Sequence, residues 1–240
     1  MSLLAVEQLE AQYGLLQAVR GVSFSISQGE ILALVGANGA GKTTLLRAIA
    51  GAHRPSAGRV LFDGTDVGEM RAHRRVRMGI ALVPEGRRLF PGLTVEENLA
   101  VADAGKRRGA WNLESVLEAF PMLRARLKRR ARDLSGGEQQ ATAIGRALMT
   151  NPRVLLLAEV SLGLAPIAVE QVYESLQTVI AGGATIVLVE QELDRALKVA
   201  TRVACMLEGR IVLEGKDLTR DQVTEAYFGL HRAGRGSRQP

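Results

Sequence analysis

Residues 36–43 have the types and spacing needed to hold phosphate groups. They read GANGAGKT, fit the pattern GxxxxGK[ST], and stand between the apolar run ILALV and a helical pattern. Backbone N–H groups of such a loop turn inward around phosphate, the ammonium of Lys42 reaches the outer phosphates, and the hydroxyl of Thr43 can ligate Mg²⁺. A glycine-rich turn that fits by chance is the alternative, which the flanking strand and helix disfavour. The predicted nucleotide-binding residues are Gly36, Ala37, Asn38, Gly39, Ala40, Gly41, Lys42, Thr43 and Thr44.

A second segment, residues 134–140, has the features of another phosphate contact. It reads LSGGEQQ and precedes the helical run ATAIGRALM. A serine hydroxyl and two glycine N–H groups at a helix N-terminus offer donors where the helix dipole favours an anion. An ordinary helix cap is the alternative, but one serine is enough for a cap and paired glycines are not needed. The segment adds four predicted nucleotide-binding residues, Ser135, Gly136, Gly137 and Glu138.

The two motifs together resemble those of the ATP-binding-cassette family, and the similarity extends from about Leu4 to Phe228. The resemblance implies that ATP and Mg²⁺ are the cofactors, and that two chains sandwich two nucleotides, because LSGGEQQ faces the ATP held by the other subunit. Tyr13 matches the aromatic residue that stacks on adenine, with a half-buried edge residue as the alternative. Glu159 matches the carboxylate that orients the attacking water, with a solvated loop acid as the alternative. SLGLAP, residues 161–166, matches the loop that touches the partner subunit.

Two further positions narrow the resemblance to a subfamily. Glu85, in VPEGRRLF, stands where many relatives have glutamine, and Gln191, in LVEQ, stands where most have a switch histidine. Both variants are similar to the ATPases that power branched-chain amino acid uptake. The resemblance implies that Glu85 contacts the nucleotide and, with Thr43, the metal, and that the segment after it meets a helix of a membrane subunit. Gln191 can donate its amide to a γ-phosphate but cannot carry a proton. The predicted catalytic residues are Lys42, Glu159 and Gln191.

The family pattern breaks at the end of the strand VLLLA. The family has aspartate, glutamate and proline there, whereas this chain has Ala158, Glu159 and Val160. The aspartate normally helps to hold Mg²⁺, and alanine offers neither charge nor oxygen. We therefore expect weakened hydrolysis, by about 10- to 100-fold if the aspartate acts through a metal-bound water. A naturally weak site, a deliberate substitution, a sequence error and compensation by another acid stay open as explanations.

The elements that must position these residues follow from the hydrophobic pattern. Short apolar runs alternate with helical patterns (EILALVG then KTTLLRAIAG, VLLLAEV then APIAVEQVYESLQTVI, TIVLVEQ then ELDRALKVA), which predicts an α/β fold with a mostly parallel core sheet. LLAVEQL, GVSFSIS and GRVLFDG predict a small antiparallel sheet beside it. Residues 89–149 are helical in pattern and predict an inserted helical subdomain. We expect a P-loop NTPase fold of the cassette type, with one domain over residues 1–230 and a loose basic tail at 231–240.

Composition excludes several classes of protein. The chain has 240 residues and is 47% hydrophobic, enough for one domain with a core, yet no apolar run approaches the roughly 20 residues that span a bilayer. The N-terminus MSLLAVEQLE lacks the features of a secretory signal, so we expect a cytosolic chain. Cys205, the one cysteine, lies in an apolar run and predicts a buried thiol. The net charge of +6 comes with arginine clusters that we interpret as solvated helix faces, because few aromatics accompany them as nucleic-acid binding would require.

These observations predict an ATPase subunit that energises uptake of branched-chain or related amino acids. The resemblance implies a second cassette, two membrane-spanning permease subunits and, indirectly, a substrate-binding protein. We expect the second cassette to be a different chain, with a homodimer as the alternative. It also implies a peripheral location on the cytoplasmic face of the inner membrane. A catalytically weak regulatory subunit is one alternative, supported by Ala158 and opposed by Glu159. A nucleic-acid-acting cassette is the other, opposed by the single cassette and by VPEGRRLF.

Overall fold

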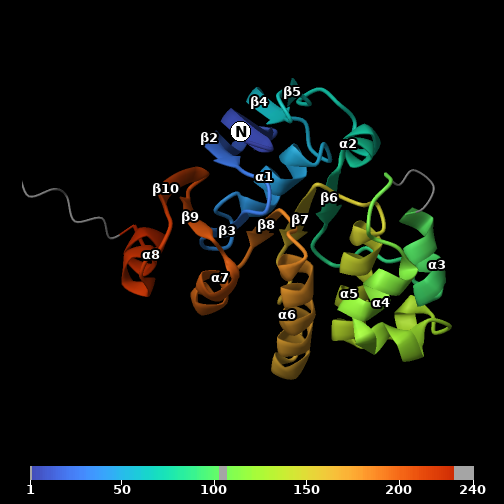
Figure 1. The fold of residues 1–240 in the computed structure, drawn as a ribbon. Coiled ribbons are helices and arrows are strands. Elements are labelled where there is room, and N and C mark those ends of the chain that lie inside the picture. Colours follow the sequence, from blue (N-terminus) through green and yellow to red (C-terminus); the bar gives the residue numbers. More distant parts are fainter. Residues whose placement is uncertain (1, 103–106, 230–240) are drawn as a thin grey trace, which may run out of the picture.

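Buried apolar runs form a central sheet of six strands. The computed structural model describes residues 2–102 and 107–229, and Figure 1 shows this sheet across the middle of the molecule. All neighbouring strands are parallel except the antiparallel edge hairpin of β9 and β10, so the predicted mostly parallel core is confirmed. The strands lie in the order β10 (Arg210–Gly215), β9 (Arg202–Leu207), β3 (Ile31–Val35), β8 (Ile186–Val189), β7 (Val154–Ala158) and β6 (Ile80–Val83).

A second, antiparallel sheet lies above the first in Figure 1. Along its first strand, apolar side chains that face the core alternate with half-buried or exposed ones, as expected of a sheet with one solvated face. The predicted small antiparallel sheet is therefore confirmed, with one short strand more than expected. Its strands lie in the order β2 (Leu16–Ile26), β1 (Leu4–Tyr13), β4 (Ala57–Phe62) and β5 (Thr65–Asp66).

Helices cover both faces of the central sheet. Helix α1 (Lys42–Ile49) lies between the two sheets, whereas α6 (Pro166–Ala181) and α7 (Leu193–Val199) lie on the opposite side (Figure 1). Side chains of β7 alternate between these layers: Leu156 and Ala158 pack in the cluster that contains α1, and Leu157 packs in the cluster that contains α6. This alternation decides which strand-end residues face the phosphate loop.

Residues 89–149 form mainly helices, at the right of Figure 1. Thr94 begins the first of them with a capping box, because its hydroxyl accepts from the N–H of Glu97 and the Glu97 carboxylate accepts from the N–H of Thr94. The division into one domain with an inserted helical subdomain stays a prediction, and the predicted tail at 231–240 lies outside the described residues. The elements are α3 (Val95–Ala100), α4 (Leu113–Ala119), η2 (Pro121–Arg126), η3 (Ala131–Asp133) and α5 (Gly136–Leu148); α8 (Arg220–Tyr227) follows the central sheet.

Helix α2 (Ala72–Met78) departs from the sequence analysis at one residue. We expected the arginine clusters to form solvated faces, and Arg71, Arg74 and Arg77 are exposed, but Arg75 is only 1% exposed. Its guanidinium donates to the carbonyls of Ala48 and Ile49 at the end of α1, at 2.8 and 2.7 Å, and to those of Gly68 and Met70. Carbonyls at a helix C-terminus lack partners within the helix, so a buried cation that satisfies them is stabilised there.

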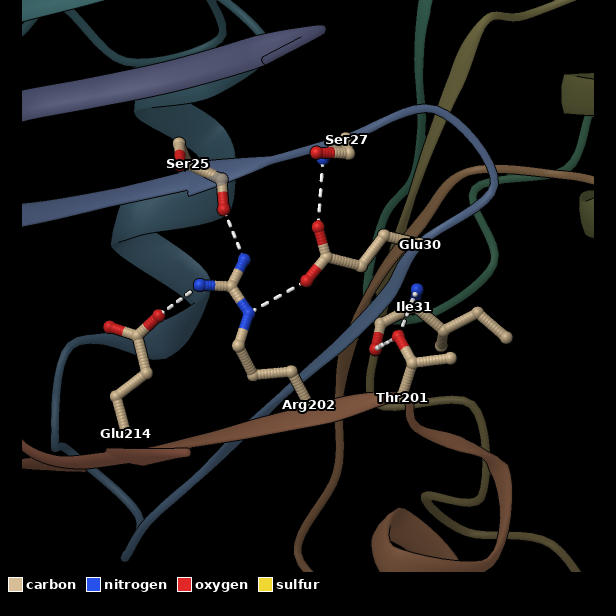
Figure 2. A network of polar contacts seen from close by, with 7 residues as sticks. All are labelled: Ser25, Ser27, Glu30, Ile31, Thr201, Arg202 and Glu214. Carbon is tan, nitrogen blue, oxygen red and sulfur yellow. Dashed lines mark hydrogen bonds and ion pairs between the residues drawn. The ribbon is translucent and has the colours of Figure 1, made fainter. Parts of the chain in front are cut away.

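An ion-pair network joins the two sheets (Figure 2). Arg202 of β9 donates through Nε to Glu30 at 2.8 Å, pairs with Glu214 of β10, and donates to the carbonyl of Ser25 in β2. The side chains of Arg202 and Glu30 are each 16% exposed. The network therefore holds the antiparallel sheet against the edge of the central sheet, away from the strand ends that carry the predicted site.

Candidate nucleotide-binding site

The phosphate loop joins β3 to α1 and depends on glycine at two tight places. Gly36 has φ +148° and Gly41 has φ +99°, both in the region that favours glycine. A Cβ on Gly36 would lie 2.2 Å from the carbonyl oxygen of Met206, and one on Gly41 would lie 2.2 Å from that of Ala18. The neighbouring strands therefore press so closely on the loop that its path requires these glycines.

Lys42 is the buried cation of this loop. Its side chain is 3% exposed, and Nζ donates to the carbonyls of Gly36 and Ala37 at 2.6 and 2.9 Å. Burial lowers the pKa of Lys42 below its ordinary value, and the nearby carboxylate of Glu159 opposes that shift. Helix α1 carries no acidic residue in its first turn and no side-chain cap. The ammonium and the positive end of the helix dipole thus act together in favour of an anion.

A pocket of about 220 Å³ opens beside this loop. Tyr13 is 45% exposed at its edge, and the other side of the Tyr13 ring packs against His53 with centroids 4.5 Å apart. Leu16 and Ala18 add apolar lining that the sequence did not predict. The pocket brings together predicted residues from three separate segments, which the structure places side by side. Its lining residues are Tyr13, Leu16, Ala18, Gly39, Gly41, Lys42, Thr43, Thr44 and Glu159.

Glu159 and Gln191 meet at the ends of two adjacent parallel strands. Glu159 follows β7 and Gln191 follows β8, and the amide Nε2 of Gln191 donates to Oε2 of Glu159 at 3.0 Å. The backbone of Glu159 has φ +48°, a left-handed conformation that costs a non-glycine residue about 1 kcal/mol or more. Such strain is common at functional sites, where the surrounding fold enforces it.

Ala158 lies one residue earlier, on the face of β7 that α1 covers. It is 2% exposed and offers no oxygen to a metal. Within residues 2–102 and 107–229, no group of three or more histidine, cysteine, aspartate and glutamate side chains is placed to hold a metal ion. Val160 is 1% exposed and packs in the α6 cluster, so it serves the apolar core. The oxygen atoms of the pocket that could face a phosphate-bound cation come from Thr43, Thr44 and Glu159.

The LSGGEQQ segment begins α5 and does not line this pocket. Ser135 caps the helix by accepting from the N–H of Glu138, and the Glu138 carboxylate accepts from the N–H of Ser135 at 2.8 Å and from Nε of Arg126 at 2.6 Å. Partial burial acts to raise the pKa of Glu138, but these hydrogen bonds outweigh it and hold the pKa below its ordinary value.

The paired glycines also have a packing role that the sequence did not reveal. A Cβ on Gly136 would lie 2.9 Å from Leu164, and one on Gly137 would lie 3.0 Å from Ala168. The start of α5 therefore packs closely on the loop and helix that follow Glu159. The glycines serve this approach whether or not their N–H groups also meet a phosphate.

Glu85 belongs to the segment after β6 and is not among the residues that line the pocket. The next residues are held from α5: Arg146 donates to the carbonyls of Arg88 and Arg87 at 2.8 and 3.2 Å, and Arg87 donates to Gln139 at 3.0 Å. Arg87 and Arg88 both have positive φ. The predicted contact of Glu85 with nucleotide and metal stays a prediction.

Two other residues complete the description. Cys205 is buried as expected, and burial raises the pKa of its thiol to about 11, so the thiol is protonated at neutral pH. Glu190 was missed by the sequence analysis. An acid at the end of the buried run TIVLV, directly before Gln191, was a signal that could have singled it out.

Comparison with known proteins agrees with this geometry. Residues 19–161 match the family model described as ABC transporter. The chain is 43% identical over 95% of its length to the whole of BraG, a high-affinity branched-chain amino acid transport ATP-binding protein of Pseudomonas aeruginosa. It is 36% identical over 89% of its length to 92% of LivF, a probable branched-chain amino acid transport ATP-binding protein of Archaeoglobus fulgidus.

A solved structure supports the same assignment. A dimeric post-hydrolysis state of an ATP-binding cassette, bound to ADP and Pi, superposes with a TM-score of 0.79 at 25% identity, over 90% of this chain and 99% of that one. In the described parts of the present chain, no helix has the length and hydropathy to span a bilayer. The chain therefore belongs to the ABC transporter family and is one of its ATP-hydrolysing cassettes.

Proposed function

We propose that this cassette drives a membrane transporter for branched-chain or related amino acids. One observation carries the proposal: a single pocket holds the buried Lys42 at the N-terminus of α1 and Glu159 at the end of β7. This is the arrangement that phosphoryl transfer to water requires, a cation at the phosphates and a carboxylate at the attacking side. The substrate class rests on the relatives BraG and LivF. The cassette itself does not contact the transported solute.

The residues of the pocket divide the chemistry among them. Tyr13 stacks on adenine, while the loop N–H groups and Lys42 bind the phosphates. Glu159 orients the attacking water, and Gln191, already bonded to Glu159, donates its amide to the γ-phosphate. Thr43 is the residue that would hold Mg²⁺, which, when bound, neutralises charge on the phosphates. ATP and water yield ADP and phosphate.

We also propose that hydrolysis is weakened at this site. The pocket has a hydroxyl at Thr43 for the metal. Ala158, which precedes Glu159 and is not among the lining residues, is buried and apolar where the family has a carboxylate that shares that task. A loss of about 10- to 100-fold in metal affinity or activity follows from removal of one supporting metal contact. Ala158 also favours a second candidate function, a nucleotide-binding regulatory subunit with little catalysis of its own.

The assembly follows from the separation of the two phosphate motifs. Ser135 and its neighbours do not line the pocket of their own chain, so a second cassette has to supply them to the nucleotide. We propose that the partner is a different cassette chain, because a partner whose own nucleotide site is intact could use this chain's LSGGEQQ to complete that site. We also propose that two permease subunits hold the pair at the cytoplasmic face of the inner membrane. Closure around ATP and opening after hydrolysis would drive transport, fed by a substrate-binding protein.

The first test is Mg²⁺-dependent ATP hydrolysis by the purified chain and by an Ala158→Asp variant. We expect the variant to turn over at least tenfold faster, because the new carboxylate would lie on the α1 face of β7, directly before Glu159 of the pocket. Lys42→Ala serves as the blank for contaminating activity. Equal turnover of the chain and of Ala158→Asp, with none in Lys42→Ala, would show that another group supplies the metal contact.

A further inference from the structure

Glu190 is a fully buried carboxylate next to the pocket that no step of the proposed reaction uses. It follows the last residue of β8 and is 0% exposed. Val187 and Val189 face α1, so the alternation of the strand turns Glu190 to the opposite face, toward α6. It therefore does not reach the pocket and is not the acid that compensates for Ala158. A buried carboxylate is costly unless hydrogen bonds satisfy it, so its partners indicate its purpose.

Three donors satisfy this carboxylate, and one of them is the backbone of the predicted catalytic residue Gln191. Oε2 accepts from the backbone N–H of Gln191 at 2.7 Å and from the hydroxyl of Ser161 at 3.0 Å. Oε1 accepts from the hydroxyl of Tyr173 on α6 at 2.6 Å. Burial and the adjacent carboxylate raise the pKa of Tyr173 far above its ordinary value, so Tyr173 remains a donor.

These contacts close a ring around the two strand ends. Glu190 binds the backbone of Gln191, the side chain of Gln191 binds Glu159, and Ser161, two residues after Glu159, returns to Glu190. The loop that follows Glu159 is folded on itself, since the N–H of Leu162 donates to the carbonyl of Glu159 at 3.3 Å. The left-handed backbone of Glu159 is thus held from both sides.

We propose that Glu190 is a positioning residue for hydrolysis. By hydrogen bonding to both the loop after β7 and the loop after β8, it fixes Glu159 and Gln191 in one orientation. The inference rests on the proposed function, since it assigns Glu190 a role in the reaction of Glu159. A catalytic carboxylate has to be held within a fraction of an ångström of its productive geometry, and packing and hydrogen bonds from a supporting residue provide this.

The test is a kinetic cycle with Glu190→Gln, Gln191→Ala and the double variant, in the native chain and in the Ala158→Asp chain. The amide keeps one acceptor oxygen and presents an NH2 group at the other position, so the donor there loses its acceptor unless, as a hydroxyl, it turns to accept from the NH2 group. We expect Glu190→Gln to lower kcat at least tenfold and to leave KM for ATP within about twofold, because Glu190 does not line the pocket. Since the two residues act as a unit, the double variant should be no slower than the slower single variant.

Glu30→Gln is the matched control for a purely structural role. Glu30 is also a largely buried carboxylate with two donors, the N–H of Ser27 and Nε of Arg202, but it lies in the network that joins the sheets (Figure 2). We expect this variant to lose thermal stability and to keep kcat. Unchanged kcat in Glu190→Gln, or losses that multiply in the double variant, would overturn the proposal.

Two further variants keep the outcomes distinct. If Glu190→Gln does not fold, Ser161→Ala removes only the donor between Glu190 and the loop, and we expect a fall in kcat of at least threefold without a change in KM; no fall would overturn the inference. Lys42→Ala and Glu159→Gln test the proposed function separately. Full turnover in Lys42→Ala and Glu159→Gln, or no turnover in the parent chains, would overturn the proposed function and the inference with it. Loss of turnover in these two variants, together with an unchanged kcat in Glu190→Gln, would overturn the inference alone.

Discussion

Ala158 controls how strongly the site should depend on metal concentration. Its methyl group lies on the α1 face of β7, directly before Glu159 of the pocket, and an aspartate would add a carboxylate there. We expect the Mg²⁺ concentration that gives half-maximal hydrolysis to fall by about 10- to 100-fold in Ala158→Asp. Titration of ATP hydrolysis with free Mg²⁺, at saturating ATP, measures this midpoint. The same midpoint in both chains would contradict a role for residue 158 at the metal.

Glu138 predicts a pH dependence of stability. Because its pKa is lowered in the folded chain, the carboxylate contributes stability that is fully present above the ordinary glutamate pKa and is lost as pH falls through the folded pKa. Glu138→Gln should therefore lower the free energy of unfolding by about 0.5 to 1 kcal/mol at pH 7, because glutamine can keep the capping hydrogen bond but loses the charge that favours the helix N-terminus and pairs with Arg126. Urea unfolding at pH 7 and at successively lower pH values measures the difference between the two chains. A difference that does not shrink on acidification would rule out this linkage.

At the residue scale, the sequence predicted side chains that belong to a motif and missed those defined by tertiary contacts. Lys42, Thr43 and Glu159 follow from a loop pattern and a strand end, and the structure brings them into one pocket. Glu190 and Arg75 belong to no motif. Their partners come from residues far away along the chain, such as Tyr173 on α6 and Ala48 on α1, so only the fold shows why these charges are buried.

The last backbone carbonyls of helix α1 accept hydrogen bonds from Arg75 of helix α2. Arg75 donates to four backbone carbonyls, two of them the last carbonyls of α1. Its removal would take a donor from each of them, although the carbonyl of Ala48 would keep the N–H of Gly51 at 3.2 Å. We expect Arg75→Ala to lower the free energy of unfolding by about 3 kcal/mol or more, the cost of breaking a buried charged network. Arg74→Ala, an exposed neighbour on the same helix, is the matched control and should stay within about 0.5 kcal/mol. Equal losses in the two variants would contradict the capping role.

At the element scale, the strands of the central sheet that were predicted have continuous apolar runs. ILALV, VLLLA and IVLV are buried on both faces, and this gives a clear pattern in the sequence. Strand β6 was not predicted, and the run 71–77 was predicted only as a solvated helix face, although Arg75 of helix α2 is internal. The close packing of α5 against the loop after β7 was also hidden, since glycine at 136 and 137 has two explanations in a sequence and only a structure separates them.

The whole molecule divides the nucleotide chemistry between two surfaces. One holds the pocket with Lys42 and Glu159, and the other holds Ser135 at the start of α5, outside that pocket. A chain with a defective pocket, mixed with a chain that has a defective α5 terminus, should therefore recover ATP hydrolysis. Lys42→Ala removes the phosphate cation and leaves Ser135 intact. Ser135→Asp leaves Lys42 intact and keeps a residue that caps helices well, but it places a negative charge where we propose that phosphate binds.

We expect each of these variants, made in the Ala158→Asp chain, to be inactive alone and hydrolysis to return when the two are mixed. In a mixed pair, the pocket of the Ser135→Asp chain meets the unaltered α5 terminus of the Lys42→Ala chain, and one complete site results. Steady-state ATP hydrolysis over a series of mixing ratios measures the recovery. Ser135→Asn, which caps α5 equally well without the charge, is the control and should stay active. Mixtures without turnover would contradict the proposal that the α5 terminus of one chain completes the nucleotide site of the other. An active Ser135→Asp chain would mean that hydrolysis does not need this terminus.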